Sequence, residues 1–257
     1  MQESIDLNAD MGESFGPWKM GDDAALLDVV SSANIACGFH AGDADVMAAT
    51  MARAVANDVG IGAHPGFRDL QGFGRRRMDV PHATLANQVR YQVGAAQGMA
   101  RAAGGAVRHL KLHGALANMA SENENLARAC YEAALSVDPD IIIMVLAGTA
   151  QEAAARSLGA RMACEIFADR AYNADCTLVD RRQPGAVIHD ADRAAARILE
   201  MLRAGAIIAE DGTHIPTRID TICLHGDTPE AVGIAKSLRA GLEAAGVRVA
   251  RFEGARG

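Results

Sequence analysis

The sequence predicts a single-domain α/β protein, residues 1 to 257, built as a distorted parallel barrel of seven or eight strands. Three observations support this fold class. Short strand-like runs alternate with helical patterns along the whole chain, no Pro- or Ser-rich linker divides it, and polar residues alternate with apolar ones inside several predicted strands. A doubly wound open sheet is the alternative that the same order of elements allows.

Eight short runs of mainly apolar residues predict the strands. Parallel strands are usually covered on both faces, so they appear in a sequence as brief apolar runs between turn residues. The predicted strands lie at residues 4 to 9, 33 to 37, 59 to 63, 107 to 113, 140 to 146, 162 to 168, 219 to 225 and 247 to 252.

Between these runs, apolar residues recur at the three- and four-residue spacing of helices. Pro81 and Pro229 stand where a first-turn proline is tolerated, and Gly159 and Gly246 follow predicted helix ends. The predicted helices cover residues 43 to 56, 81 to 103, 122 to 135, 150 to 158, 190 to 202 and 229 to 245.

Alternation within the strands favours the closed barrel over the open sheet. In the first strand, Asp6, Asn8 and Asp10 alternate with apolar residues and therefore share one face. Three later strands repeat the pattern, with Gly62 and His64, with His109, Lys111 and His113, and with Cys223, His225 and Asp227. Because both faces of a parallel sheet are usually covered, these polar groups are predicted to point into a shared interior cavity.

The polar residues also gather near the carboxyl ends of the predicted strands, where the loops of a barrel converge on one pocket. Carboxylates, imidazoles and a lysine in one cavity shift one another's pKa values, which suits general acid–base chemistry in a hydrolase or lyase. The residues predicted to be catalytic are Asp10, Glu13, His40, His64, Lys111, His113, His225 and Asp227.

A glycine-rich loop between residues 62 and 77 is predicted to hold the substrate. Its arginines stand beside glycines, and guanidinium groups with nearby backbone amides suit a carboxylate or a phosphate. The residues predicted to bind substrate are Asn8, Asp43, Arg68, Arg75, Arg76, Asp169 and Arg170, and Arg77 belongs to the same loop.

A metal site is an open alternative. Asp10, His40 and His64 offer the oxygen and nitrogen ligands that suit zinc or manganese. The chain has no compact metal motif, since HExxH is absent and the only histidines four residues apart lie in a predicted strand.

Composition and missing motifs exclude several classes of protein. The formal charge of −7 and the absence of a basic run argue against nucleic acid or an anionic membrane as partner. No apolar run approaches 18 residues and the amino terminus lacks a signal-peptide pattern, so a cytoplasmic protein is expected. The five cysteines form no CxxC and are expected to be reduced.

Nucleotide-binding and nucleophile motifs are also missing. The sequence contains no phosphate-binding loop and no dinucleotide fingerprint between a strand and a helix. Residues 12 to 16 match GxSxG, but Pro17 and Trp18 follow in place of a helix, so a nucleophile elbow is not expected.

Six ordered motifs, spread over nearly the whole chain, resemble one known family. They are DLNADMGESFG (6 to 16), NIACGFHAGD (34 to 43), GAHPGFRDLQGFGRR (62 to 76), KLHGALAN (111 to 118), EIFADRAY (165 to 172) and LHGD (224 to 227). These motifs resemble the LamB/YcsF family, the A subunits of the bacterial ATP-dependent 5-oxoprolinase. The resemblance implies a barrel related to the polysaccharide-deacetylase and glycoside-hydrolase type.

The resemblance also implies an assembly with two further subunits, B and C, that together convert 5-oxoproline to glutamate with ATP hydrolysis. The partners would then bind ATP and phosphorylate the lactam, which explains why this chain has no phosphate-binding loop. In this chain, an arginine or Lys111 would hold the carboxylate or phosphate. Water would be activated by Asp10, His40, His113 or Asp227.

Two other functions stay open. One is a metal-dependent amide hydrolase of the deacetylase type that works without ATP, and the other is a non-catalytic subunit that binds the lactam for its partners. The chain also departs from the family, which usually has a proline after the motif lysine and a tyrosine before its asparagine. Leu112 and Ala117 stand at these positions, a departure that concerns substrate fit more than chemistry.

Overall fold

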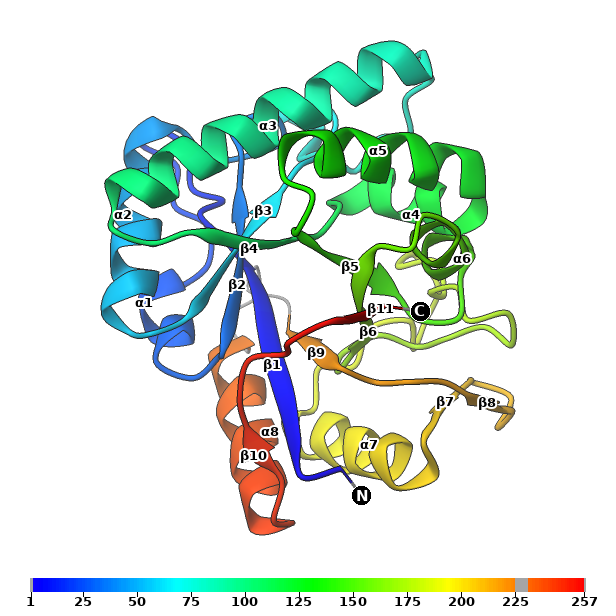
Figure 1. Ribbon diagram of the computed structural model, residues 1–257. Helices are drawn as coiled ribbons and strands as arrows, with labels where there is room; N and C mark the ends of the chain where they lie inside the picture. Colours follow the sequence, from blue (N-terminus) through cyan, green and yellow to red (C-terminus); the bar gives the residue numbers. More distant parts are fainter. Residues whose placement is uncertain (1, 225–230, 257) are drawn as a thin grey trace.

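A closed ring of seven parallel strands forms the centre of the computed structural model, which describes residues 2–224 and 231–256 (Figure 1). The strands are β1 (Ser4–Met11), β2 (Ser32–Ala36), β3 (Gly60–His64), β4 (Val107–Leu110), β5 (Ile142–Leu146), β6 (Arg161–Phe167) and β9 (Thr221–Leu224). Strands β1 to β6 pair in the order of the sequence, and β9 pairs with both β6 and β1 and thereby closes the ring. The barrel prediction is confirmed, and the open sheet is ruled out.

Helices surround the ring on its outside (Figure 1). They are α1 (Asp23–Leu27), α2 (Ala44–Ala56), α3 (His82–Ala102), α4 (Gly114–Glu122), α5 (Glu124–Val137), α6 (Ala150–Ser157), α7 (Ala191–Ala204) and α8 (Ala231–Ala244), with a short 3₁₀ helix, η1 (Leu70–Gly72). All six predicted helices are present. The sequence missed α1, whose five residues are too few to show a helical period, and α4.

The missed α4 explains why the predicted fourth strand was too long. Strand β4 ends at Leu110, although the backbone continues alongside β3, where the Lys111 amide donates to the Ala63 carbonyl and the His113 amide to the Pro65 carbonyl. Helix α4 then begins at Gly114, whose positive φ of 55° turns the chain out of the extended conformation.

The predicted eighth strand lies outside the barrel. Only two of its residues form a strand, β10 (Arg248–Val249), which pairs in parallel with the start of β1. The sequence also missed the antiparallel hairpin of β7 (Ala206–Ile208) and β8 (His214–Pro216), and β11 (Ala255–Arg256), which pairs with β6. Segments of two or three residues carry too little periodicity to be predicted.

The main apolar core fills the space between the ring and the helices. Outward-facing strand residues such as Leu7, Ile35 and Leu110 are buried in one cluster with helix residues such as Met51 and Val89. All five cysteines are free and buried, as expected for reduced thiols. In the part of the chain that the structure describes, no helix has the length and apolar content needed to cross a bilayer.

The inside of the barrel is polar. Asn34 Nδ2 donates hydrogen bonds to Asn8 Oδ1 at 2.7 Å and to Asp10 Oδ1 at 2.9 Å, while Asn8 Nδ2 donates to Thr221 Oγ1 at 2.7 Å. His109 Nε2 lies 2.8 Å from Asn34 Oδ1, so His109 belongs to the same hydrogen-bond network. The alternating polar residues of the strands therefore do point inward, as the sequence predicted.

Gly62 leaves room for the imidazole of His109 inside the ring. A Cβ atom added at Gly62 would lie 2.1 Å from His109 Nε2, which is far closer than van der Waals contact permits. Any side chain here would displace the imidazole from Asn34. The glycine of this strand is therefore required by the packing of the barrel interior.

Asp6 generates a test of this polar interior. The hydroxyl groups of Ser31 and Ser32 each donate a hydrogen bond to Asp6 Oδ1 at 2.7 Å, and Thr221 donates to Oδ2. Burial raises the pKa of Asp6 to about 6 in spite of these donors. The folded protein therefore holds this proton more tightly than the unfolded chain does. The stability that the proton contributes is full below pH 3.8 and is lost as the pH rises through about 6.

Titration of Asp6 changes the unfolding free energy by about 3 kcal/mol in total, and roughly half of this change falls between pH 5 and 7.5. Asp6→Asn removes the titrating group. As the pH rises from 5 to 7.5, the unfolding free energy of wild type should therefore fall by about 1 to 2 kcal/mol more than that of the variant. Urea unfolding of both proteins across this range measures the difference. Parallel pH profiles for the two proteins would contradict the assignment.

Candidate functional site

A cavity of about 920 Å³ opens at the carboxyl ends of the barrel strands. Asp10 of β1, Glu165 and Phe167 of β6, and the residues that follow β4 line its inner wall. The loop after β6 forms its outer wall with residues 173 and 175 and 177 to 183. Of the predicted site residues, Asp10, Arg75, Lys111, His113 and Arg170 line this cavity.

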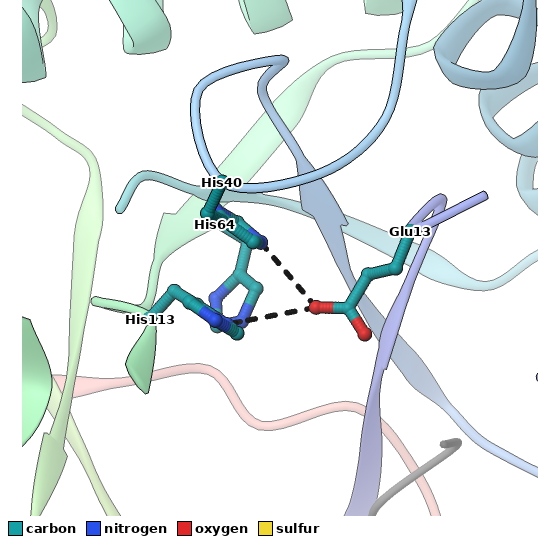
Figure 2. Close-up of side chains that lie close together, drawn as sticks. All are labelled: Glu13, His40, His64 and His113. Carbon is teal, nitrogen blue, oxygen red and sulfur yellow. Dashed lines mark hydrogen bonds and ion pairs between the residues drawn. The ribbon is translucent and has the colours of Figure 1, made fainter. Parts of the chain in front are cut away.

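Beside the cavity, four side chains from the ends of four successive strands form what we call the histidine cluster: Glu13, His40, His64 and His113 (Figure 2). One potential ligand atom from each lies within 4.8 Å of the others. Glu13 follows β1, His40 follows β2, His64 ends β3 and His113 follows β4. The barrel therefore gathers residues that are up to 100 positions apart in the sequence.

The rings of the histidine cluster are packed against one another. His40 stacks on His113 with ring centroids 3.6 Å apart, and the ring of His64 stands perpendicular to that of His113 at 4.9 Å. Glu13 Oε1 lies 3.3 Å from His40 Nε2 and 3.5 Å from His113 Nδ1 (Figure 2). Each ring is therefore held in a fixed orientation.

Backbone carbonyls determine which ring nitrogens carry hydrogen. His64 Nδ1 lies 2.9 Å from the Lys111 carbonyl oxygen, and His113 Nε2 lies 2.8 Å from the Phe73 carbonyl oxygen. Because a carbonyl oxygen only accepts, these two nitrogens must donate. In the neutral rings, the lone pairs of His64 Nε2 and His113 Nδ1 then face each other across 3.0 Å.

Burial keeps two of these imidazoles neutral. It lowers the pKa of His113 to about 3 and that of His40 well below the ordinary value, and the neighbouring histidines act in the same direction. The lone pair of His113 Nδ1 therefore faces His64 Nε2 at 3.0 Å and the Glu13 carboxylate at 3.5 Å. A positive charge there, carried by a proton or a metal ion, would relieve the repulsion.

The glycine-rich loop that precedes α3 packs directly on the histidine cluster. A Cβ atom at Gly74 would lie 2.7 Å from His40 Cβ and 2.8 Å from His113 Cδ2, and one at Gly66 would lie 2.7 Å from His40 Nδ1. Asp69 and Arg76 form an ion pair inside the same loop. Glycines at these positions therefore let the backbone cover the rings closely.

A second group, which we call the lysine cluster, surrounds the buried amino group of Lys111. Lys111 Nζ lies 2.9 Å from Asp10 Oδ1, 2.8 Å from Glu165 Oε1 and 3.0 Å from Cys223 Sγ. Burial by itself disfavours the ammonium form, but Asp10, Cys223 and Glu165 outweigh it and raise the pKa of Lys111 well above its ordinary value. Lys111 therefore stays charged at neutral pH.

Asp10 connects the two clusters. Its Oδ1 pairs with Lys111 and accepts from Asn34, while its Oδ2 lies 3.3 Å from His64 Nε2. Of the predicted metal ligands Asp10, His40 and His64, the two histidines belong to a four-residue group that could hold an ion and that also contains Glu13 and His113.

Sequence reasoning missed Glu165. A carboxylate in the middle of the apolar strand β6 was the available signal, because it repeats the polar alternation of β1 and β4. It also missed Asn34, which stands in the middle of the apolar strand β2 and joins Asn8, Asp10 and His109.

The structure separates several predicted substrate-binding residues from the cavity. Asn8 is fully buried beneath Lys111, at 3.5 Å from Nζ, and Asp43 caps helix α2 by accepting from the amides of Asp45 and Val46. Arg68 is exposed and does not line the cavity, and Arg76 is paired with Asp69. Asp169 is buried next to Arg170. His225 and Asp227 lie outside the described residues.

Comparison with known proteins gives close relatives over the whole chain. The model of the LamB/YcsF family matches residues 5–257. A protein of Ruegeria pomeroyi, named as the A subunit of 5-oxoprolinase, is 71% identical over 249 residues, which cover 97% of this chain and 98% of the relative.

Solved structures agree with the fold. The lactam utilization protein from Thermus thermophilus superposes with a TM-score of 0.91 and 42% identity, covering 97% of this chain and 100% of the other. The Bc1960 peptidoglycan N-acetylglucosamine deacetylase superposes with a TM-score of 0.52 and 12% identity over 99% of this chain and 90% of the other, which is evidence of a shared fold alone. The expected deacetylase-type barrel is thus confirmed.

The ion pairs of the lysine cluster lead to a prediction about the free energy of unfolding. Lys111→Met keeps the apolar stem but leaves the buried carboxylate of Glu165 and the partly exposed carboxylate of Asp10 without their cation, so the unfolding free energy should fall by about 3 to 5 kcal/mol. Adding Glu165→Gln should restore part of the loss, since one unpaired charge disappears.

Urea unfolding of both variants measures these changes, and Lys236→Met, at an exposed position of α8, serves as the matched control. A Lys111→Met protein as stable as wild type would show that Lys111 does not compensate the buried carboxylates.

Proposed function

The chain belongs to the LamB/YcsF family, and we propose that it is the A subunit of a 5-oxoprolinase, in which its barrel opens the lactam ring of 5-oxo-L-proline to give L-glutamate. The names of its relatives support this role, since the Ruegeria protein is named as the A subunit of 5-oxoprolinase and the Thermus protein as a lactam utilization protein.

One observation carries the proposal. A buried ammonium, that of Lys111, and a partly exposed carboxylate, that of Asp10, lie 2.9 Å apart on the wall of one cavity, next to the neutral imidazole of His113. A hydrolase that opens an amide needs a group that takes a proton from water and a cation that stabilises the oxyanion. Asp10 and Lys111 fit these two roles.

The chemistry also explains a need for ATP. A five-membered lactam keeps its amide resonance, so water attacks its carbonyl carbon slowly. Transfer of the γ-phosphoryl group of ATP to the carbonyl oxygen creates a leaving group. Water then adds to the carbon, Asp10 accepts its proton, and the ring C–N bond breaks to leave an acyl phosphate. A second water hydrolyses this acyl phosphate to the carboxylate of glutamate and inorganic phosphate. The ring nitrogen takes up a proton and becomes the amino group of glutamate.

We propose that two partner subunits, B and C, bind ATP and carry out the phosphorylation, while the barrel performs the ring opening. The absence of a phosphate-binding loop from the sequence supports this division. An ATP-consuming assembly also fits the cytoplasm, and the five free cysteines agree with a reducing compartment.

We further propose that Glu13, His40, His64 and His113 hold one divalent ion. Three imidazole nitrogens and one carboxylate oxygen suit zinc or manganese. The carbonyl contacts of His64 Nδ1 and His113 Nε2 are of the kind that orients metal-binding histidines. When bound, such an ion supplies a Lewis acid or lowers the pKa of water.

This cluster also favours a second candidate function, a metal-dependent amide hydrolase that needs no ATP. A third candidate is a subunit that binds the lactam without reacting with it. Reconstitution separates the three, because each predicts a different pattern of activity and a different response to loss of Asp10.

Turnover of 5-oxo-L-proline should require this chain and both partner subunits together. Glutamate formation from 5-oxo-L-proline and ATP is measured for this chain alone, for the two partner subunits, and for all three together. Only the complete mixture should be active, and Asp10→Asn should lower its turnover by about 100-fold or more. The matched control, Asp175→Asn, removes an exposed carboxylate that lines the same cavity and should retain activity.

The same assay distinguishes the alternatives. Activity of the isolated chain without ATP would identify the amide hydrolase. Full activity of the assembly that contains Asp10→Asn would identify a subunit that only binds substrate.

Metal binding is tested on the purified chain. Titration with Co²⁺ or Zn²⁺, followed by mass spectrometry under native conditions, should give one ion per chain. His113→Ala should weaken binding by at least tenfold because it removes one ligand. His214→Ala, which changes an exposed histidine of β8, should leave binding unchanged. Failure of the wild-type chain to retain an ion would leave a proton as the charge between His64 and His113.

A further inference from the structure

Arg170 is a buried, charged residue at the wall of the cavity. It belongs to the loop that follows β6, and only 5% of its surface is exposed. Arg170 nevertheless lines the 920 Å³ cavity together with Asp10, Lys111 and His113. A buried charge at a cavity wall costs free energy unless another group compensates it.

No carboxylate in the described part of the chain forms an ion pair with Arg170, although the charge of Asp169 favours its protonated form. Arg170 Nη2 donates to the Val179 carbonyl at 2.7 Å and Nε donates to the Ala186 carbonyl at 3.4 Å. Within residues 2–224 and 231–256, no carboxylate oxygen pairs with its guanidinium and no acceptor pairs with Nη1. The guanidinium is therefore oriented by the loop, while part of its hydrogen-bonding capacity stays unused.

Two other arginines of the same cavity are paired with carboxylates. Arg77 forms an ion pair with Glu122 at 2.6 Å, and Arg182 forms one with Asp180 at 2.5 Å. Arg170 is more deeply buried than either and forms no such ion pair within the described residues.

The surroundings of Arg170 are electrostatically strained. Burial lowers its pKa to about 10, and the positive charges of Arg181 and Arg75 lower it further, while Asp169 acts in the opposite direction. At neutral pH the group is still a cation. An anion bound at this wall would relieve the cost of burial and the repulsion between the arginines at once.

We propose that Arg170 binds the carboxylate of the substrate and thereby restricts the barrel to lactams that carry a carboxylate next to the ring nitrogen. The inference rests on the proposed function and adds the group that decides substrate specificity. A guanidinium held in place by two carbonyl contacts presents a planar pair of donors that matches a carboxylate.

A carboxylate anchor suits ring opening because this group does not react. It keeps its charge in the lactam, in the activated lactam and in glutamate, so a contact to it holds the molecule throughout the reaction. The carbonyl can then face Lys111 and Asp10 on the inner wall of the same cavity. A phosphate group would also satisfy a guanidinium, and the experiment distinguishes the two anions.

The test compares three ligands by calorimetry on the purified chain: 5-oxo-L-proline, its uncharged analogue 5-oxo-L-prolinamide, and inorganic phosphate. Wild type should bind the acid at least tenfold more tightly than the amide. Arg170→Gln should weaken binding of the acid by about 10- to 100-fold and leave the amide unchanged, the scale of one charged hydrogen-bonded contact. Arg182→Gln, the matched control, should change neither affinity.

Other outcomes overturn the proposal. Equal binding of acid and amide by wild type does so without any variant. A wild-type preference for phosphate over the acid would assign the site to a phosphoryl group instead. An Arg170→Gln protein that is folded and keeps the preference for the acid would exclude Arg170 as the anchor.

Arg170→Gln could fail to fold, because the loop depends on the carbonyl contacts of Arg170. Chemical modification of the wild-type protein tests the proposal in that case. Phenylglyoxal labelling of Arg170, read by mass spectrometry, should be suppressed by the acid and not by the amide, and equal labelling with and without the acid would overturn the proposal. Turnover of the complete assembly is measured in parallel. If the wild-type chain binds the acid and the amide equally while the complete assembly still turns over 5-oxo-L-proline, this inference alone is contradicted. An assembly that forms no glutamate contradicts the proposed function.

Discussion

A positive charge at Lys111, buried inside a ring of seven strands, meets the carboxylates of Asp10 and Glu165 within 3 Å. Each of these groups would be costly to bury alone, and together they compensate one another. The pair also fixes Asp10, whose second oxygen reaches His64. Lys111 contacts the histidine cluster directly as well, since its carbonyl oxygen accepts from His64 Nδ1 at 2.9 Å.

The two clusters divide the work of the site by charge. Burial keeps His40 and His113 of the histidine cluster neutral by lowering their pKa values, whereas Lys111 of the lysine cluster keeps its charge because it is paired with carboxylates. Gly66 and Gly74, which cover the rings, allow this dense packing. The barrel interior thus places two different electrostatic environments side by side, and Asp10 and the Lys111 carbonyl connect them.

The loop after β6 adds a feature that neither cluster has. Arg170 is oriented by carbonyl groups and has no carboxylate partner among the described residues, so the outer wall of the cavity is suited to an anion. Lys111 and Asp10 lie on the inner wall. In the proposed function, a carboxylated lactam would match both walls, because it has an anion to anchor and a carbonyl to attack.

The sequence by itself determined the barrel, since polar alternation in β1 and β4 has no stable explanation on a covered parallel sheet except an inward-facing interior. It also identified Asp10, Lys111 and His113, because each stands at a strand end. Which groups pair was decided only by the tertiary structure. Glu165 reaches Lys111 from a strand more than 50 residues away, and contacts of this kind depend on the order and register in which the ring closes, which no local pattern in the sequence records.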